Sequence, residues 1–319
     1  MAWSLLPTTE SLPLLDTSIV RNHQKRKGLG LAALSAAAFA VMTLLVRILS
    51  DRGMSSLQIM VWRCAVQTVA ATLACRIFLN IAPFRVSGGW KRFRWVLVRA
   101  VFGSAGHLLY YVALSKLPMG IATVLFFTNP IFTALLARLM LGESFSGLHR
   151  LLAALCLVGI ALVVLPTFPF TLIGGILLYG SLAWSLCALL GAAAVALAYV
   201  SIRKAGTAVH AMVHVTYFGI VGTMGGLALM AAANTSDLHP LLFSFSAITM
   251  LDFWLVVGVG LAAFAAQFLM NWGLQLAPAG PAVMMRNSDI VITFILDAVL
   301  YRTVPGLSSI IGAAIITGC

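Results

Sequence analysis

The sequence predicts an all-α integral membrane protein with ten transmembrane helices, built as two inverted repeats of five helices each. The first observation is composition: of 319 residues, 61% are hydrophobic and only 9% are charged, whereas soluble domains carry about 25% charged residues. The second is a series of ten apolar runs long enough to cross a bilayer. The third is an internal similarity between residues 110–137 and 270–297.

The ten expected spans follow from the thickness of a bilayer, whose hydrocarbon core of about 30 Å requires roughly 20 apolar residues in a helix. They cover residues 28–50, 55–78, 95–115, 119–141, 149–166, 172–202, 208–232, 252–274, 279–301 and 304–319. The sixth is too long for one upright crossing, so we expect it to tilt or to begin as an interfacial helix. The tenth is short, and we expect that helix to be incomplete in the given sequence.

Three segments divide the chain. Residues 1–27 are polar, contain two prolines and end in the basic run RNHQKRK, so we expect a disordered cytoplasmic tail. Residues 28–166 form the first five-helix repeat, and residues 172–319 form the second.

Lysine and arginine residues flank the expected spans unevenly. With a cytoplasmic N-terminus, eleven of them lie on the cytoplasmic side and three on the other, so both termini are expected in the cytoplasm. The same flanking pattern explains the net charge of +12 without a nucleic-acid partner. The membrane stays open between plasma membrane and endomembrane, with a vacuole or lysosome suggested by the dileucine-like ESLPLL at residues 10–15.

The internal similarity requires no gap. Both segments carry the pattern Leu-x3-Pro-x-Gly-x-Ala, which begins at Leu114 in the first and at Leu274 in the second. With five spans in each half, the second half must cross the membrane in the opposite sense to the first. Inverted repeats of this kind recur in secondary transporters, which hold substrate near the midplane between the halves.

The two similar segments are offset by 160 residues, and polar residues inside the expected spans pair at the same offset. The corresponding pairs are His107 and Gln267, Tyr111 and Asn271, and Asn129 and Asp289. Ionised side chains near a bilayer centre cost about 2.5–3.5 kcal/mol on insertion scales, so they face a bundle interior or a wet cavity. The pattern therefore predicts one shared central cavity.

A resemblance to a known family rests on two stretches, ALSKLPMGIATVLFFTNPIFTALLARLMLGE at 113–143 and LAPAGPAVMMRNSDIVITFILD at 276–297. They resemble the drug/metabolite transporter superfamily of EamA type, including the Gly142–Glu143 pair that closes helix four. The likeness covers roughly residues 28–319 and is nearest to the solute carrier family 35 G group. It implies a basket of ten helices, alternating access, and a cavity walled mainly by helices 1, 3, 4, 6, 8 and 9.

The candidate substrate-binding residues are Arg63, His107, Tyr111, Asn129, Gln267, Asn271, Arg286 and Asp289. Three simpler interpretations stay open. Arg286 and Asp289 could only brace helix nine as an ion pair, and His107 could be a hydrogen-bonded core histidine. Arg63 could pair with an acid across the bundle. Asp289 and His107 are also the candidates for proton coupling, because an anion that competes for Arg286 would favour protonation of Asp289, and histidine titrates near neutral pH.

These residues favour a secondary-active transporter of a small organic anion, because Arg63, Arg286 and His107 make the cavity electropositive despite Asp289. Amino acids or other zwitterions and amines are the alternative, since Asp289 could hold an amine. Nucleotide sugars are disfavoured: phosphate carriers of the resembled superfamily use paired basic residues on helix nine, whereas Asn287 follows Arg286 here.

An integral-membrane enzyme and a channel are the candidates from other classes. We expect no catalytic residue, because neither HExxH nor GxSxG occurs and the loops are short. We also expect no metal or other cofactor: the five cysteines show no CxxC spacing, and His210 and His214 lack a third zinc ligand. The expected partners are a small-molecule substrate and membrane lipid, with a homodimer left open.

Overall fold

A computed structural model describes residues 17–82, 84, 89–117, 119–143, 147–164, 180–233, 249–301 and 307–318. Within these ranges every regular element is an α-helix and no strand occurs. The helices are α1 (Thr17–Asp51), α2 (Ser56–Ile77), α3 (Gly89–Lys116), α4 (Met119–Phe126), α5 (Asn129–Leu141), α6 (Gly147–Val164), α8 (Gly180–Ala205), α9 (Ala211–Ala233), α11 (Met250–Leu276), α12 (Ala279–Arg286), α13 (Asp289–Tyr301) and α14 (Leu307–Gly318). Seven stretches of the described residues are long and apolar enough to cross a membrane, which is the pattern of a multi-pass membrane protein.

Local sequence determines several helix ends. Ser55 and Gln58 form a capping box at the start of α2: the Ser55 hydroxyl accepts the Gln58 backbone N–H at 3.3 Å, and Gln58 Oε1 accepts the Ser55 N–H at 3.1 Å. Thr249 and Asp252 form the same box at the start of α11. Gly142 ends α5 with a φ of 68°, a left-handed conformation that glycine adopts without steric cost.

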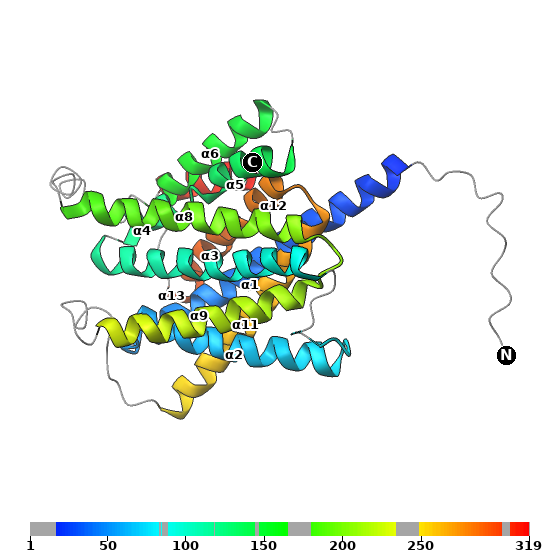
Figure 1. Cartoon of the computed structure of the whole chain (residues 1–319). Coiled ribbons are helices and arrows are strands. Elements are labelled where there is room, and N and C mark those ends of the chain that lie inside the picture. The colour runs from blue at the N-terminus through cyan, green and yellow to red at the C-terminus, as the bar shows by residue number, and fades with distance from the viewer. Residues whose placement is uncertain are drawn as a thin grey trace, which may run out of the picture.

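One expected boundary differs from the structure. α1 begins at Thr17, so residues 17–27, predicted to belong to a disordered tail, are helical; no proline or glycine interrupts them before residue 28. Figure 1 shows this end of α1 extending out of the bundle, and residues 22–27 are exposed. Residues 1–16, with the dileucine-like hexamer, lie outside the described residues. So do residues 172–179 of the expected sixth span, whose described part is α8.

Close helix pairs build the bundle. α3 packs along α8, α1 along α11, α2 along α9 and α6 along α14, and the first and third of these pairs lie side by side in Figure 1. Glycines allow the closest approach: a Cβ on Gly106 would lie 2.7 Å from the Gly191 carbonyl oxygen, and a Cβ on Gly191 would lie 2.8 Å from that of Gly106. Small residues at helix interfaces are typical of membrane bundles. They hold α3 and α8 in a fixed register.

The outward surface is apolar. Leu73, Leu139 and Leu190 are 51%, 71% and 60% exposed, which suits a surface covered by lipid chains. Polar side chains are instead buried inside the bundle, among them arginines of α2, α3 and α12. The bundle is thus apolar outside and partly polar inside.

Candidate functional site

Two of the expected spans are interrupted. α4 ends at Phe126 and α5 begins at Asn129; α12 ends at Arg286 and α13 begins at Asp289. The breaks lie 160 residues apart, the spacing of the internal similarity. The sequence carries one signal for the first break, Pro130 in the first turn of α5, since proline lacks an amide hydrogen and is favoured there. Breaks in membrane helices expose backbone groups that bind ions and polar ligands.

Arg286 and Asp289 flank the second break and form an ion pair, with 3.3 Å between Arg286 Nη2 and Asp289 Oδ2. Both side chains are buried, at 8% and 7% exposed. The guanidinium also lies 4.6 Å over the ring of Phe39 and 5.4 Å over that of Phe127. Arg286 Nε and Asp289 Oδ1 have no hydrogen-bond partner within the described part of the chain. The bracing contact is therefore present, and it leaves hydrogen-bonding capacity for a ligand.

Arg99 is a buried cation that the sequence analysis missed. It lies in α3, is 1% exposed, and donates from Nη2 to Gln267 Oε1 on α11 at 2.7 Å. Its guanidinium lies 4.7 Å over the ring of Phe218 and against Gly103, where an added Cβ would overlap Nη1. Arg99 lies inside the expected span of residues 95–115, but the residue 160 positions further on is the apolar Val259, so the spacing that selected the other polar residues did not select Arg99. Its spacing of four and eight residues from Gly103 and His107, which places all three on one helix face, was the signal available.

Arg63 in α2 is 2% exposed. Its Nη1 contacts the Met42 sulfur at 3.4 Å, and its Nε and Nη2 have no hydrogen-bond partner among the described residues. No carboxylate of the described ranges forms an ion pair with Arg63 or Arg99. Unpaired buried charges are costly. We refer to Arg63, Arg99 and Arg286 together as the arginine cluster.

All three arginines of the cluster act electrostatically on His107. It is half-buried, and its Nδ1 donates to the Gly103 carbonyl oxygen at 2.7 Å. In the neutral ring this leaves Nε2 as an acceptor. The rings of Phe126 and Phe218 meet it edge-on, with centroids 5.8 Å and 5.6 Å away. His107 is thus held in place by one hydrogen bond while one ring nitrogen stays available.

The predicted residues of α3 and α11 divide into two groups. Tyr111 lies within electrostatic range of Arg63, and Gln267 bonds the Arg99 guanidinium, so both belong with the arginine cluster. Asn271 instead donates to the Ala211 carbonyl oxygen, at 3.5 Å, where α9 begins. Its contact supports the position of α9 and does not involve an arginine.

The residues around the first break have local hydrogen bonds. Asn129 is fully buried and donates to the Phe126 carbonyl oxygen at 3.1 Å, which bridges the break. Tyr110, which the sequence analysis did not single out, stacks on the Phe126 ring at 4.2 Å and shares a hydrogen bond of 3.1 Å with the Thr123 hydroxyl. Tyr110 is also within electrostatic range of Asp289. Tyr110 therefore lies near both breaks, as does Phe127, which follows α4 and contacts Arg286.

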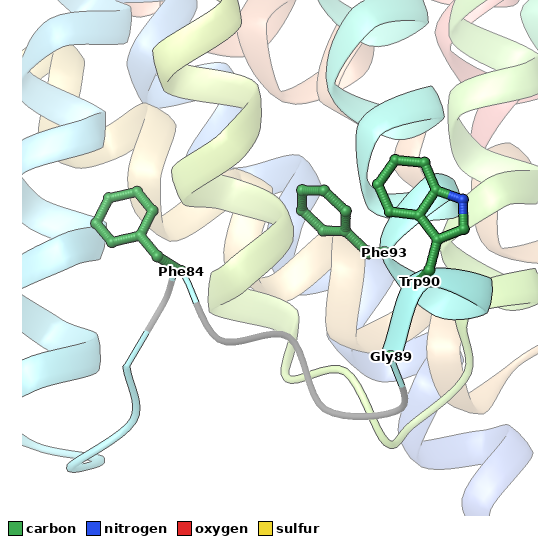
Figure 2. Close-up of a pocket in the computed structure, with 4 residues that line it drawn as sticks. All are labelled: Phe84, Gly89, Trp90 and Phe93. Carbon is green, nitrogen blue, oxygen red and sulfur yellow. The ribbon is translucent and has the colours of Figure 1, made fainter.

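The arginine cluster is closed to water in this conformation, since none of its three residues is more than 6% exposed. A hollow of about 210 Å³ lies elsewhere, at the start of α3, and is lined by Phe84, Gly89, Trp90 and Phe93 (Figure 2). That lining contains no charged side chain. The expected midplane cavity is therefore not open at these arginines.

An ion pair ties together four helix ends. Arg203, near the end of α8, lies 2.5 Å from Glu143, which follows α5. Arg203 Nη1 also donates to the carbonyl oxygens of Leu274, at 3.2 Å, and Ala277. Glu143 Oε2 accepts the backbone N–H of Ala279 at 3.0 Å. The Glu143–Arg203 pair thus fixes the α11–α12 junction against α5 and α8.

A second ion pair lies at the other end of α11. Arg52, just after α1, pairs with Asp252 in the first turn of α11 and donates to the Thr249 hydroxyl at 3.1 Å. The hydrogen bond to Asp252 raises the pKa of Arg52. The 27 residues of α11 rise about 40 Å, so the two ion pairs lie at opposite ends of the bundle.

Among the described residues no group of three or more His, Cys, Asp or Glu side chains could hold a metal ion. His210 Nδ1 accepts the Met212 backbone N–H at 3.2 Å, and its ring stacks on Phe268 at 6.2 Å. His214 is fully buried, with no hydrogen-bond partner for either ring nitrogen in the described ranges. The two histidines therefore gain no third zinc ligand from these ranges.

Comparison with known proteins places these features in a family. The model of the EamA-like transporter family matches the chain twice, over residues 26–165 and 182–318. The chain belongs to the EamA-like transporter family. The resemblance to EamA domains drawn from the two quoted stretches is thus confirmed, and an EamA match covers each half of the chain.

Individual EamA relatives are distant. Solute carrier family 35 member G1 of Homo sapiens is 28% identical over 291 residues, which span 90% of this chain and 76% of that protein. The pseudopaline exporter CntI of Pseudomonas aeruginosa (strain UCBPP-PA14) is 25% identical over 291 residues, 91% of this chain and 93% of that protein. One crystal structure superposes with a TM-score of 0.71 at 18% identity, covering 93% of this chain and 95% of the other. That structural likeness supports the fold, and the named relatives are transporters.

Proposed function

We propose that the protein is a secondary-active transporter of a small organic anion, which works by alternating access between two inverted five-helix halves. The observation that carries the substrate class is the charge balance of the buried site. Among the described residues, the arginine cluster brings three cations together with one carboxylate, Asp289. A site with a surplus of buried positive charge stabilises an anion and disfavours a cation.

The inverted repeat is supported by the helix packing. When the first half of the chain is matched to the second, α1 corresponds to α8, α2 to α9, α3 to α11 and α6 to α14. In this matching the α3–α8 interface corresponds to α11–α1, and α3–α9 to α11–α2, while α2–α9 and α6–α14 correspond to themselves. These are the most extensive interfaces in the described part of the chain. The double EamA match and the two helix breaks follow the same correspondence.

The ion pairs at the two ends of α11 fit alternating access. The Glu143–Arg203 pair closes one end of the bundle, and the Arg52–Asp252 pair closes the other. Partly exposed ion pairs are weak, at about 0–1 kcal/mol, so each can break during a transport cycle. An occluded conformation, with both pairs formed and the arginine cluster buried, is the intermediate that such a cycle requires.

Proton coupling through Asp289 fits the same geometry. Its partner Arg286 is a candidate anion-binding group, so an entering anion would compete for the guanidinium and leave Asp289 without its cation. Protonation of Asp289 would then remove a buried negative charge. His107, on which the arginine cluster acts, is the second candidate proton carrier.

Zwitterions are the runner-up substrates, because Asp289 Oδ1, which has no hydrogen-bond partner in the described part of the chain, could accept a hydrogen bond from an amine. The similarity to a pseudopaline exporter is compatible with export of the solute. Counterflow in proteoliposomes, with labelled carboxylates, amino acids and nucleotide sugars as probes, distinguishes these classes. We expect saturable counterflow of a carboxylate; preference for a cation would contradict the proposal. Absence of counterflow together with conductive flux would indicate a channel.

Both termini are proposed to be cytoplasmic, in the plasma membrane or an endomembrane. Single cysteines at exposed positions provide the test, in a variant without native cysteines. Met250, at the start of α11, is expected to face outward, and Lys91, at the start of α3, to face the cytoplasm. A membrane-impermeant maleimide should label residue 250 in right-side-out vesicles and leave residue 91 unlabelled. The reverse pattern would invert the topology.

A further inference from the structure

We infer that Arg99 forms a second anion subsite, so that the transported solute carries two separated anionic groups. The inference rests on the proposed transport of an organic anion and names the kind of anion. Arg99 is 1% exposed, has no carboxylate partner, and keeps Nε without a hydrogen-bond partner among the described residues. A buried guanidinium in this state is compensated when an anionic ligand arrives.

The neighbour of Arg99 preserves its charge. Gln267 Oε1 accepts the Nη2 hydrogen bond at 2.7 Å and thereby orients the guanidinium. An amide at this position satisfies one donor without cancelling the positive charge, whereas a carboxylate would cancel it. Phe218 covers one face of the guanidinium at 4.7 Å, and the Nε donor has no partner among the described residues.

Arg99 and Arg63 have separate contacts. The Arg99 guanidinium bonds Gln267 of α11 and lies against Gly103 of α3, whereas Arg63, on α2, contacts the Met42 sulfur on α1 at 3.4 Å. Both arginines act electrostatically on His107. Two anionic groups on one molecule can therefore bond the two guanidinium groups separately.

The charge balance agrees with two anionic groups. Within the described ranges, the three cations of the arginine cluster face one anion, Asp289, which leaves two positive charges without a buried partner. A solute with two negative charges compensates both, and a monoanion leaves one unpaired. The expected solute is therefore a dianion with two anionic groups, such as a dicarboxylate.

Counterflow with matched probes tests the inference. Proteoliposomes containing the full chain are preloaded with unlabelled probe, and uptake of labelled succinate, succinamate and inorganic phosphate is measured at neutral pH. Succinamate differs from succinate by the loss of one negative charge. The wild-type protein should prefer succinate by at least about tenfold, the value of one charged hydrogen bond. Phosphate, with its charge on one group, should compete as weakly as succinamate.

Two variants assign the preference to Arg99. Arg99→Gln should slow succinate uptake much more than succinamate uptake, so that the two probes are taken up at similar rates. Gln267→Glu, which keeps Arg99 but neutralises it in place, should have the same effect. Arg94→Gln removes an exposed arginine of α3 that lies over the Trp95 ring and should retain the succinate preference. Monodisperse elution in detergent identifies the folded variants, and Gln267→Glu decides if Arg99→Gln fails to fold.

Failure of the two-subsite inference can be distinguished from failure of the proposed anion transport. Equal uptake of succinate and succinamate by the wild-type protein, or effective competition by phosphate, would overturn the two-subsite inference while the anion carrier stands. The same holds if Gln267→Glu keeps the full succinate preference, or if the variants slow both probes equally. Exchange of amines in place of any anion would instead overturn the proposed function itself.

Discussion

Glu143 and Arg203 lie 2.5 Å apart and join the end of α5 to the end of α8. The same two side chains hold the α11–α12 junction, because Arg203 donates to the Ala277 carbonyl oxygen and Glu143 accepts the Ala279 N–H. One ion pair therefore controls whether four helix ends stay together. The Gly142–Glu143 pair that suggested the family from sequence has a structural role at this junction.

Loss of the Glu143–Arg203 ion pair should loosen one end of the bundle. Glu143→Gln removes the ion pair, and we expect the amides around Ala279 to exchange with deuterium up to about fivefold faster, since partly exposed pairs contribute about 1 kcal/mol or less. Asp252→Asn is the matched control at the other end of α11, where Asp252 Oδ2 accepts the Thr249 N–H at 2.9 Å. It should speed exchange near Thr249 only. Faster exchange at both ends in either variant would argue against two independent closures.

Gly103 should be required for the position of Arg99. A Cβ at residue 103 would overlap Arg99 Nη1 and lie 3.1 Å from the Phe218 ring. Overpacking of this kind costs about 1–3 kcal/mol, so Gly103→Ala should lower the thermal stability and reduce anion counterflow together. Gly30→Ala is the control, because among the described residues no side chain and no backbone atom of another helix lies within 4 Å of a Cβ there. Normal transport by Gly103→Ala would show that Arg99 can move without consequence.

Asp289→Asn should separate exchange from proton coupling. The amide cannot bind a proton in place of the carboxylate, so we expect anion exchange to persist while acceleration by an inward proton gradient is lost. Uptake with and without a pH gradient measures both. A variant that still responds fully to the gradient would exclude Asp289 as the coupling group. If Asp289→Asn fails to fold but Arg286→Ala with Asp289→Asn folds, the ion pair is a brace only.

His210, in the loop before α9, should make stability depend on pH. Burial lowers its pKa from the ordinary value of 6.5, so protonation favours the unfolded chain. The contribution is complete above about pH 6.5 and declines as the pH falls below that value. Because His210 Nδ1 accepts the Met212 N–H, the loss should reach about 1 kcal/mol, the value of a helix-capping bond. His210→Asn keeps an acceptor that does not titrate there, and it should reduce the fall in melting temperature between pH 7 and 5; an unchanged fall would assign the effect to other groups.

Sequence patterns were sufficient for the class of protein and for part of the site. Apolar runs and flanking charges predicted a multi-pass helical protein, and the quoted stretches predicted the EamA family. The 160-residue spacing selected Gln267 and Asp289, which the structure places beside Arg99 and Arg286. It also selected Asn271, whose hydrogen bond goes to the start of α9 instead. Periodicity identifies the inward face of a helix but not the partner across it.

What the sequence determined by itself depends on local chemistry: apolar length sets a span, Ser55 and Thr249 start helices, and Gly142 ends one. Only the tertiary structure decided which buried charges have partners. Arg286 has Asp289 three residues away, so its ion pair could be predicted from spacing. Arg99 bonds Gln267 at a separation of 168 residues, and that contact exists because α3 and α11 pack in one bundle. The free energy of a buried charge depends on everything that surrounds it in space, and a linear sequence does not contain those distances.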